Sequence, residues 1–123
     1  MEISTSISKK RALKAFKCAY FNLMFYKDVE NTGLNAEDVF SNKKRYKNKN
    51  SKWFKSPESV EDSFRWLIAV GILRREVDGQ GLTCKVRLTP LARKLLESNP
   101  DIPNQKASLY EQLKEWTYKK WAI

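Results

Sequence analysis

Basic side chains are concentrated in one segment of this chain, and the chemistry open to them is the binding of anions. Seven cations and no acidic residue lie in this segment: Lys43, Lys44, Arg45, Lys47, Lys49, Lys52 and Lys55. Without them the net charge of +10 would fall to +3. Lysine and arginine attract phosphate backbones, anionic membranes and acidic proteins at long range, with little dependence on sequence. For the lysines as a group we favour contact with phosphates.

Aromatic residues are interleaved with these cations, and two roles are open to them. Tyr46, Trp53 and Phe54 would suit the stacking of unpaired bases beside a cationic groove. Alternatively, Trp53 and Phe54 dock the segment on the protein core while the lysines stay in water. For these two residues we favour docking.

A second set of polar side chains follows later in the chain and could contact a nucleic acid. It consists of Arg65, Arg74, Arg75, Gln80, Lys85 and Arg87. Between Thr83 and Leu88 apolar and polar residues alternate, as in a strand with one apolar and one basic face. Gln80 belongs to the turn before this run, where it would reach a minor-groove edge. We expect these residues to join the basic segment in binding DNA.

Three carboxylates, those of Glu58, Glu61 and Asp62, stand near the start of a predicted helix. Together they would suffice to bind a divalent cation, but the positive end of the helix dipole already explains acidic residues there. We therefore expect no metal and no cofactor. On a helix facing DNA these carboxylates would repel phosphates, so we expect duplex affinity to come mainly from the flanks. The same acidic face would suit a basic protein partner.

Catalytic patterns are missing from the sequence. The chain has no histidine, which excludes histidine-dependent catalysis and the common Cys/His zinc sites. It also lacks a glycine-rich phosphate loop and a nucleophile elbow. Cys18 and Cys84 are isolated, and two such thiols predict a reducing compartment, which we take to be the cytoplasm. We therefore expect a protein that is not an enzyme.

Helix signals divide the chain into five predicted helices and one hairpin. Asn35, Ser56 and Thr89 are suited to be N-caps, and the latter two are followed by a proline at the first helical position. The turn from Asp78 to Gly81 separates two strand-like runs. The predicted helices are Lys9–Lys27, Asn35–Asn42, Pro57–Ile72, Pro90–Ser98 and Lys106–Ala122, with a two-stranded wing near Arg74–Leu88. The first part of the basic segment has no apolar period, so we predict a loop or a frayed helix extension there.

Apolar residues cover several sides of the first predicted helix in its second half, and aromatic residues enrich the last helix. Such helices are buried on several sides, either at the centre of the domain or between two subunits. Together they offer more apolar surface than a small monomer leaves exposed. We therefore predict a homodimer. Its interface would contain Phe21, Met24, Phe25, Leu109, Leu113, Trp116 and Trp121.

Two strings carry a resemblance to a known family. LIAVGILRR (67–75) precedes the hairpin, and LTPLARKLL (88–96) begins at its end. Helix, basic hairpin and helix in this order resemble winged helix-turn-helix proteins, in particular MarR-like and PadR-like regulators. Members often have glycine where this chain has Ala92. The resemblance implies a support helix near Asn35–Asn42 and a DNA-contacting third helix, and the connection between them is unusually long here.

At 123 residues the chain is long enough for one domain with its own core, and no apolar run approaches the ~20 residues that span a bilayer. We expect a mostly α fold, a winged helix with a two-stranded wing and an extra C-terminal helix, over residues 1–123. Residues 1–30 would contain the N-terminal helix. Residues 34–98 would form the helix-turn-helix and wing, and residues 105–123 a packing or dimerisation helix.

The function we expect is the binding of double-stranded DNA by a small transcriptional regulator with basic flanks. Two alternatives stay open. One is a protein-interaction adaptor on the same scaffold, with the acidic helix meeting a basic partner. The other is a binder of single-stranded nucleic acid or RNA, with the aromatic residues of the basic segment as stacking platforms.

Overall fold

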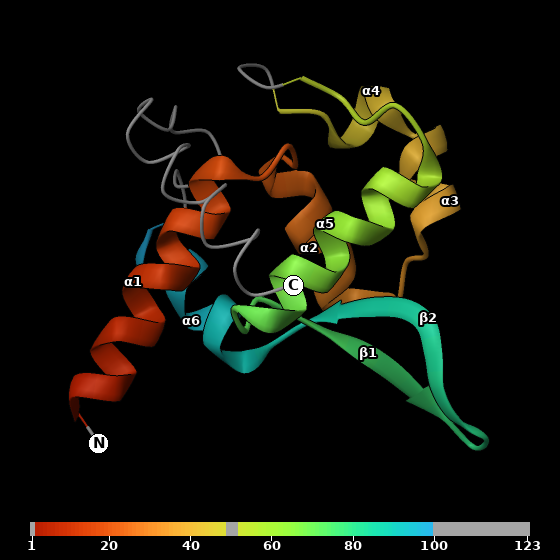
Figure 1. Ribbon diagram of the computed structural model, residues 1–123. Helices are drawn as coiled ribbons and strands as arrows, with labels where there is room; N and C mark the ends of the chain where they lie inside the picture. The colour runs from red at the N-terminus through yellow and green to blue at the C-terminus, as the bar shows by residue number, and fades with distance from the viewer. Residues whose placement is uncertain (1, 49–51, 100–123) are drawn as a thin grey trace.

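The computed structural model describes residues 2–48 and 52–99, which form six helices and one β-hairpin (Figure 1). The prediction of a mostly helical fold with a two-stranded antiparallel hairpin is confirmed. None of the described helices is long and apolar enough to cross a membrane. The elements are α1 (Glu2–Cys18), α2 (Leu23–Asn31), α3 (Ala36–Ser41), α4 (Lys43–Tyr46), α5 (Pro57–Ala69), β1 (Leu73–Asp78), β2 (Gly81–Leu88) and α6 (Pro90–Ser98).

Several predictions fall on residues that the structure does not describe. The predicted helix Lys106–Ala122 lies outside the described residues, and so does Lys49 of the basic segment. The same holds for four residues of the predicted dimer interface, namely Leu109, Leu113, Trp116 and Trp121.

The prediction of one continuous helix over Lys9–Lys27 is wrong, because the chain forms two helices there. α1 ends at Cys18, and α2 begins after Asn22, whose side-chain oxygen accepts from the Phe25 amide at 3.1 Å. The backbone amide of Asn22 in turn donates a hydrogen bond to the Tyr46 carbonyl oxygen at 2.9 Å, and Phe21 pairs with Lys47 in an isolated β-bridge. The backbone between the two helices therefore bonds to the last residue of α4 and to the residue that follows it.

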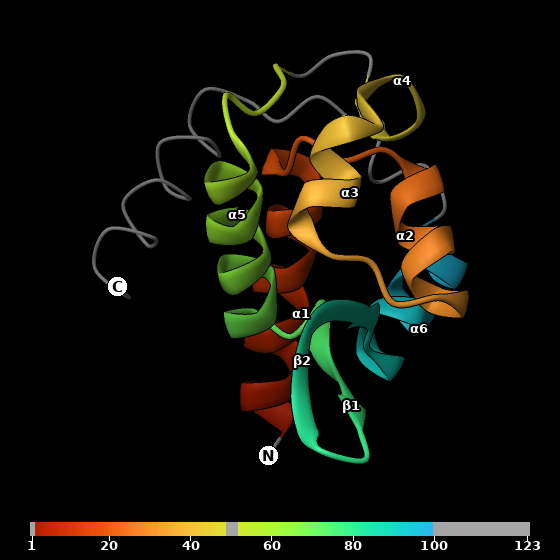
Figure 2. The same ribbon diagram turned by 90° about the vertical axis from the view of Figure 1, so that its right-hand side faces the viewer.

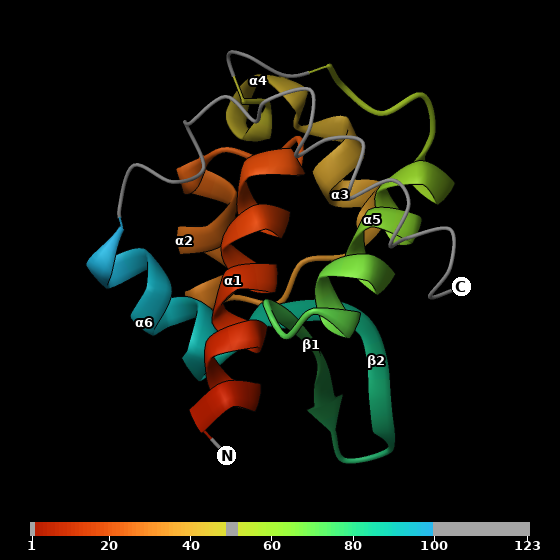
Figure 3. The ribbon, with the colours of Figure 1, turned by 60° about the vertical axis from the view of Figure 1, so that its left-hand side comes forward.

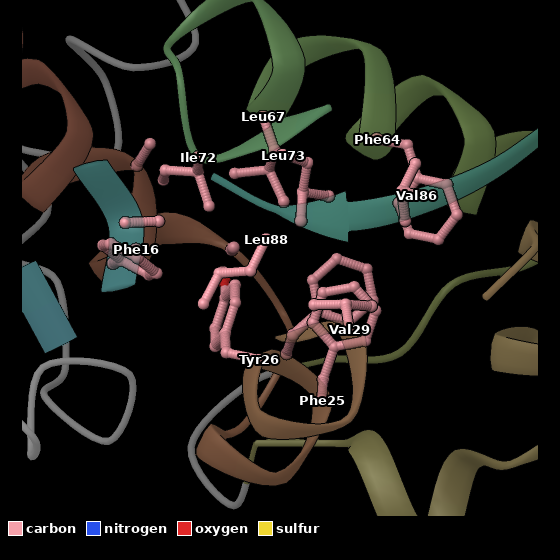
Figure 4. Close-up of a cluster of buried hydrophobic side chains, with 14 of the residues drawn as sticks. Phe16, Phe25, Tyr26, Val29, Phe64, Leu67, Ile72, Leu73, Val86 and Leu88 are labelled. Carbon is pink, nitrogen blue, oxygen red and sulfur yellow. The ribbon is translucent and has the colours of Figure 1, made fainter. Parts of the chain in front are cut away.

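Aromatic residues of α2, of α5 and of the turn before α2 fill the centre of the molecule (Figure 4). The Phe21 and Phe25 rings stack with their centroids 4.0 Å apart, and the Phe25 and Phe64 rings stack at 5.9 Å. Phe21 and Phe25 are both fully buried, so their assignment to a dimer interface is wrong. Their side chains are used by the chain's own core. Met24 is 42% exposed and is the part of that predicted interface that lies on the described surface.

The hydroxyl of Tyr26 is buried in this core without a hydrogen-bond partner among the described residues. Burial raises the pKa of Tyr26, so the side chain stays neutral. A buried hydroxyl without a partner lowers stability, because it has lost its bonds to water. Tyr26→Phe should therefore raise the free energy of unfolding by about 1 kcal/mol, measured by urea denaturation.

Tyr46→Phe is the matched control, because the Tyr46 hydroxyl donates to Asp28 Oδ2 at 2.8 Å and its removal should destabilise. Loss of stability in Tyr26→Phe would contradict the interpretation and would mean that the hydroxyl is bonded to a buried water.

The hairpin joins the end of α5 to the start of α6. α5 ends at Ala69, three residues before the predicted Ile72, and Gly71 turns the chain with a φ of 86°. Leu73 pairs with Leu88 at the base of the hairpin, and the register shifts further along, where Glu76 of β1 stands opposite the three residues 83–85 of β2. The Thr89 hydroxyl caps α6 and also donates to the Gly71 carbonyl oxygen. This bond fixes α6 to the turn before the hairpin.

A third segment lies along the hairpin, on the open side of β2. Leu34 forms an isolated antiparallel bridge with Val86, with backbone N···O distances of 3.3 and 2.8 Å. The segment before α3 therefore lies next to β2, and β2 next to β1. α3 begins beyond it, capped by Asn35 as predicted, and packs beside α5 (Figure 2). α1 runs beside α6 on the side of the molecule away from α3 (Figure 3).

Candidate nucleic-acid interface

The basic segment begins with the short helix α4, where sequence reasoning expected a loop or a frayed helix extension. Lys43 and Lys44 on this helix are exposed, and so are Lys52 and Lys55 in the extended stretch before α5. Lys47 is partly buried, and its Nζ donates to the Asn48 carbonyl oxygen at 3.2 Å. Four lysines of the predicted phosphate-binding segment are thus exposed on the described surface.

Arg45 belongs to the same segment but makes contacts within the protein. Its Nε lies 2.7 Å from Asp28 Oδ2 and its Nη2 lies 3.1 Å from Asp28 Oδ1. The guanidinium therefore binds the carboxylate with two parallel hydrogen bonds, and the Tyr46 hydroxyl donates a third hydrogen bond to it. Arg45 joins α4 to α2, so its assignment to DNA binding is not supported by this geometry.

The guanidinium of Arg45 and the Tyr46 hydroxyl hold the pKa of Asp28 below its usual range. Asp28→Asn should lower the free energy of unfolding at pH 7 by about 1 kcal/mol, because Arg45 is exposed and water screens the pair. A carboxylate with a depressed folded-state pKa stabilises above its unfolded pKa, and this stability is lost as pH falls through the folded pKa. The difference between wild type and variant should thus be constant above about pH 5 and vanish in strong acid. Urea denaturation at several pH values tests this, and a difference independent of pH would contradict it.

Trp53 and Phe54 dock the end of the basic segment on the core, as favoured from the sequence. Both are partly buried against the core cluster. The Phe54 ring lies 5.2 Å from the Phe21 ring and 5.1 Å from the Tyr20 ring, and the Trp53 ring lies 6.3 Å from Phe21. These rings hold Lys52 and Lys55 in place before α5.

Arg75, at the base of the hairpin, is also engaged within the protein. Its guanidinium pairs with the Glu61 carboxylate on α5 and donates to the Cys84 carbonyl oxygen at 3.0 Å. The pair links β1 to α5, and both side chains are largely buried, with 19% and 25% exposed. The predicted role of Arg75 in DNA binding is therefore not supported by this geometry, and Glu61 belongs to a structural pair rather than to a free set of carboxylates.

Arg87 caps the last turn of α2 from the neighbouring strand. Its Nε and Nη2 donate to the carbonyl oxygens of Val29 and Glu30 at 3.2 and 3.0 Å, and its Nη1 lies 3.2 Å from Glu76 Oε1. The last carbonyls of a helix have no partner within the helix, and a cation there also faces the negative end of the dipole. The predicted role of Arg87 in phosphate binding is therefore replaced by a structural one.

Arg74, Lys85 and Gln80 remain exposed on the hairpin, which projects away from the helices (Figure 1). The turn is stabilised by Asp78, whose Oδ1 accepts from the Gln80 amide at 2.7 Å. Sequence reasoning found Lys85 by alternation, Arg74 by its place at the start of the hairpin and Gln80 by its place in the turn, and all three lie on this ribbon.

The outer face of α5 and α3 is mainly acidic. Glu58 and Asp62 are exposed on α5, and Glu37 and Asp38 are exposed on α3, which packs beside it (Figure 2). Arg65 is exposed on the same face, and its Nη1 lies 4.0 Å from Asp62 Oδ1. We call these five residues the acidic face. Cations lie at both ends of it, with Lys52, Lys55 and α4 at the start of α5 and the hairpin beyond its end.

Metal binding finds no support in the described residues, where no three His, Cys, Asp or Glu side chains are grouped as ligands. Sequence reasoning missed two features of this surface. It did not find Asp28 as the partner of Arg45, because the two are 17 residues apart. It also did not single out Val77 and Leu82, which lie exposed near the hairpin turn.

Comparison with known proteins gives a family for this chain. The family model described as Npun_F0494-like matches residues 2–119, which include every described helix and strand. The searches of curated proteins and of solved structures find no match.

Proposed function

The chain belongs to the Npun_F0494-like family, and we propose that it binds double-stranded DNA as a small winged-helix regulator. In this proposal the α3–α5 pair faces the major groove, and cations at both ends of α5 contact the phosphates. The observation that carries the proposal is this division of charge, with exposed cations at the two ends and exposed carboxylates between them.

The order of the elements supports the proposal. α2, the Leu34 bridge, α3, α5, β1 and β2 follow one another as in a winged helix, with the hairpin as the wing. In helix-turn-helix proteins the second helix of the motif enters the major groove. Here that helix is α5, and Leu34 beside β2 completes the small sheet from which the wing projects. The stretch between α3 and α5 is longer than a tight turn, and it contains α4 and the exposed lysines.

The dimensions of α5 agree with this placement. A helix of 13 residues is about 20 Å long, whereas the major groove is about 12 Å wide. The two ends of α5 would therefore lie over the phosphates that border the groove. Lys52 and Lys55 would approach one side, and Arg74 and Lys85 the other. Asp62, in the second turn of α5, would lie over the base edges, where a carboxylate can accept a hydrogen bond from the cytosine amino group. Glu58, in the first turn, would lie nearer the phosphates.

A second candidate is a protein-interaction adaptor, and the exposed acidic face favours it. Carboxylates on two adjacent helices would complement a basic protein partner better than a phosphate backbone. Binding of a duplex by the full-length chain discriminates between the two functions. The adaptor becomes the better proposal if removing the charges of Arg74 and Lys85 leaves duplex affinity unchanged.

A further inference from the structure

The far end of the hairpin carries two apolar side chains that the fold does not use. Val77 and Leu82 lie opposite each other in the ladder, and they are 62% and 76% exposed. Large apolar residues of the described part are otherwise mostly buried, with Met24 as the other exposed one. These two side chains are therefore free to be buried against a partner that contacts the hairpin.

The pair lies beyond the part of the hairpin that packs on the core. Val86 and Leu88 of β2 are buried against the helices, whereas Leu82, nearer the turn, is exposed. The register shifts between them, because Glu76 of β1 stands opposite the three residues 83–85 of β2. Such a bulge increases the local twist of a ribbon. Two exposed cations lie on the core side of the pair, Lys85 within the bulge and Arg74 opposite Arg87. The hairpin thus carries an exposed apolar pair next to its turn and exposed cations nearer its base.

We propose that Val77 and Leu82 form a wedge that enters the minor groove of a bound duplex and partly unstacks a base step. This inference rests on the proposed binding of duplex DNA. The rim of the minor groove is anionic phosphate, which complements Arg74 and Lys85. Its walls are sugars and its floor is base edges, against which an apolar pair can be buried.

The groove must deform to admit this ribbon. A minor groove is about 6 Å wide, whereas a β-ribbon with side chains on both faces is roughly 10 Å thick. Proteins that place apolar side chains there open the groove and kink the duplex toward the major groove. Pyrimidine–purine steps unstack most easily, so the wedge should prefer a duplex with a TA step beneath the hairpin.

The test uses full-length protein and a short duplex with one central TA step, labelled at both ends for energy transfer. Wild type should bend this duplex. Val77→Ser with Leu82→Ser should abolish the bend and weaken binding about tenfold, because two apolar side chains lose their burial. The dependence of affinity on salt should not change, because no charge is removed. The matched control is Cys84→Ser, which makes an exposed side chain of the same hairpin more polar outside the pair and should bind and bend like wild type.

Three outcomes would overturn the wedge, and they are distinguishable. If the double variant binds and bends the duplex like wild type, the wedge is wrong while duplex binding stands. If sedimentation shows that the double variant has half the mass of wild type, the pair is a contact between two copies of the chain. If wild type binds no duplex at all, the proposed function fails, and the wedge with it. Both positions are exposed, so thermal melting should confirm that the double variant folds.

Discussion

Replacing Arg87 by alanine should lower the free energy of unfolding by about 2 kcal/mol, the largest change in stability that we expect from one substitution outside the core. The guanidinium donates hydrogen bonds to the Val29 and Glu30 carbonyl oxygens and to the Glu76 carboxylate at the same time. Alanine would leave these oxygens without their partner in a partly buried place. Urea denaturation at neutral pH measures the effect.

Two further variants separate capping from charge. Arg87→Lys keeps the charge but cannot reach three oxygens with a fixed planar fork, so its stability should lie between those of wild type and Arg87→Ala. Lys85→Ala removes an exposed cation from the same face of β2 and should change stability by less than about 0.5 kcal/mol. If Lys85→Ala and Arg87→Ala lowered the free energy of unfolding by the same amount, Arg87 would have no special structural role.

Removing the two exposed charges of the hairpin should weaken duplex binding. Arg74→Gln with Lys85→Gln should lower affinity about tenfold near physiological salt, because each exposed ion contact contributes on the order of 0.7 kcal/mol. The loss should be similar for duplexes of different sequence, because phosphate contacts carry no sequence information. Fluorescence anisotropy with labelled duplexes measures it. The fold should be unaffected, because both side chains are exposed.

Removing negative charge from the acidic face should have the opposite effect on duplex affinity. Glu58→Gln with Asp62→Asn should strengthen non-specific duplex binding, because the repulsion of nearby phosphates is removed. This pair leaves out Glu61, whose carboxylate holds Arg75 and whose loss would disturb the hairpin. Unchanged affinity in this variant would place α5 away from the duplex and would leave only the flanks in contact.

Local signals predicted much of the fold. Asn35, Ser56 and Thr89 were identified as caps from their residue types. In each case the side-chain oxygen accepts a hydrogen bond from a backbone amide of the helix. The hairpin was predicted from its alternation and its turn. The break before α2 was missed, because Asn22 stands inside an apolar run and its role depends on Tyr46, far along the chain. A tertiary contact thus ended a helix that periodicity alone would continue.

The candidate site was predicted less completely, for a related reason. Residue types identified the cations, and four lysines of the basic segment with Arg74 and Lys85 are indeed exposed. The residue type alone does not show which cations already bind a partner within the fold. Arg45, Arg75 and Arg87 find their partners 17, 14 and as many as 58 residues away, across contacts that only the fold creates. Arg75 and Arg87 are mostly buried in these pairs, whereas Arg45 stays half exposed although its guanidinium is paired.

The dependence of duplex affinity on salt tests the proposed interface most directly. If Lys52, Lys55, Arg74 and Lys85 each contact one phosphate, log affinity should fall against log salt with a slope of about −3.5 per bound copy, and about −7 for a dimer. Neutralising Arg74 and Lys85 should reduce the slope by about 2 per copy, and neutralising Lys52 and Lys55 by the same amount. A slope near zero in wild type, or one that neither pair of substitutions changes, would contradict duplex binding through the two ends of α5.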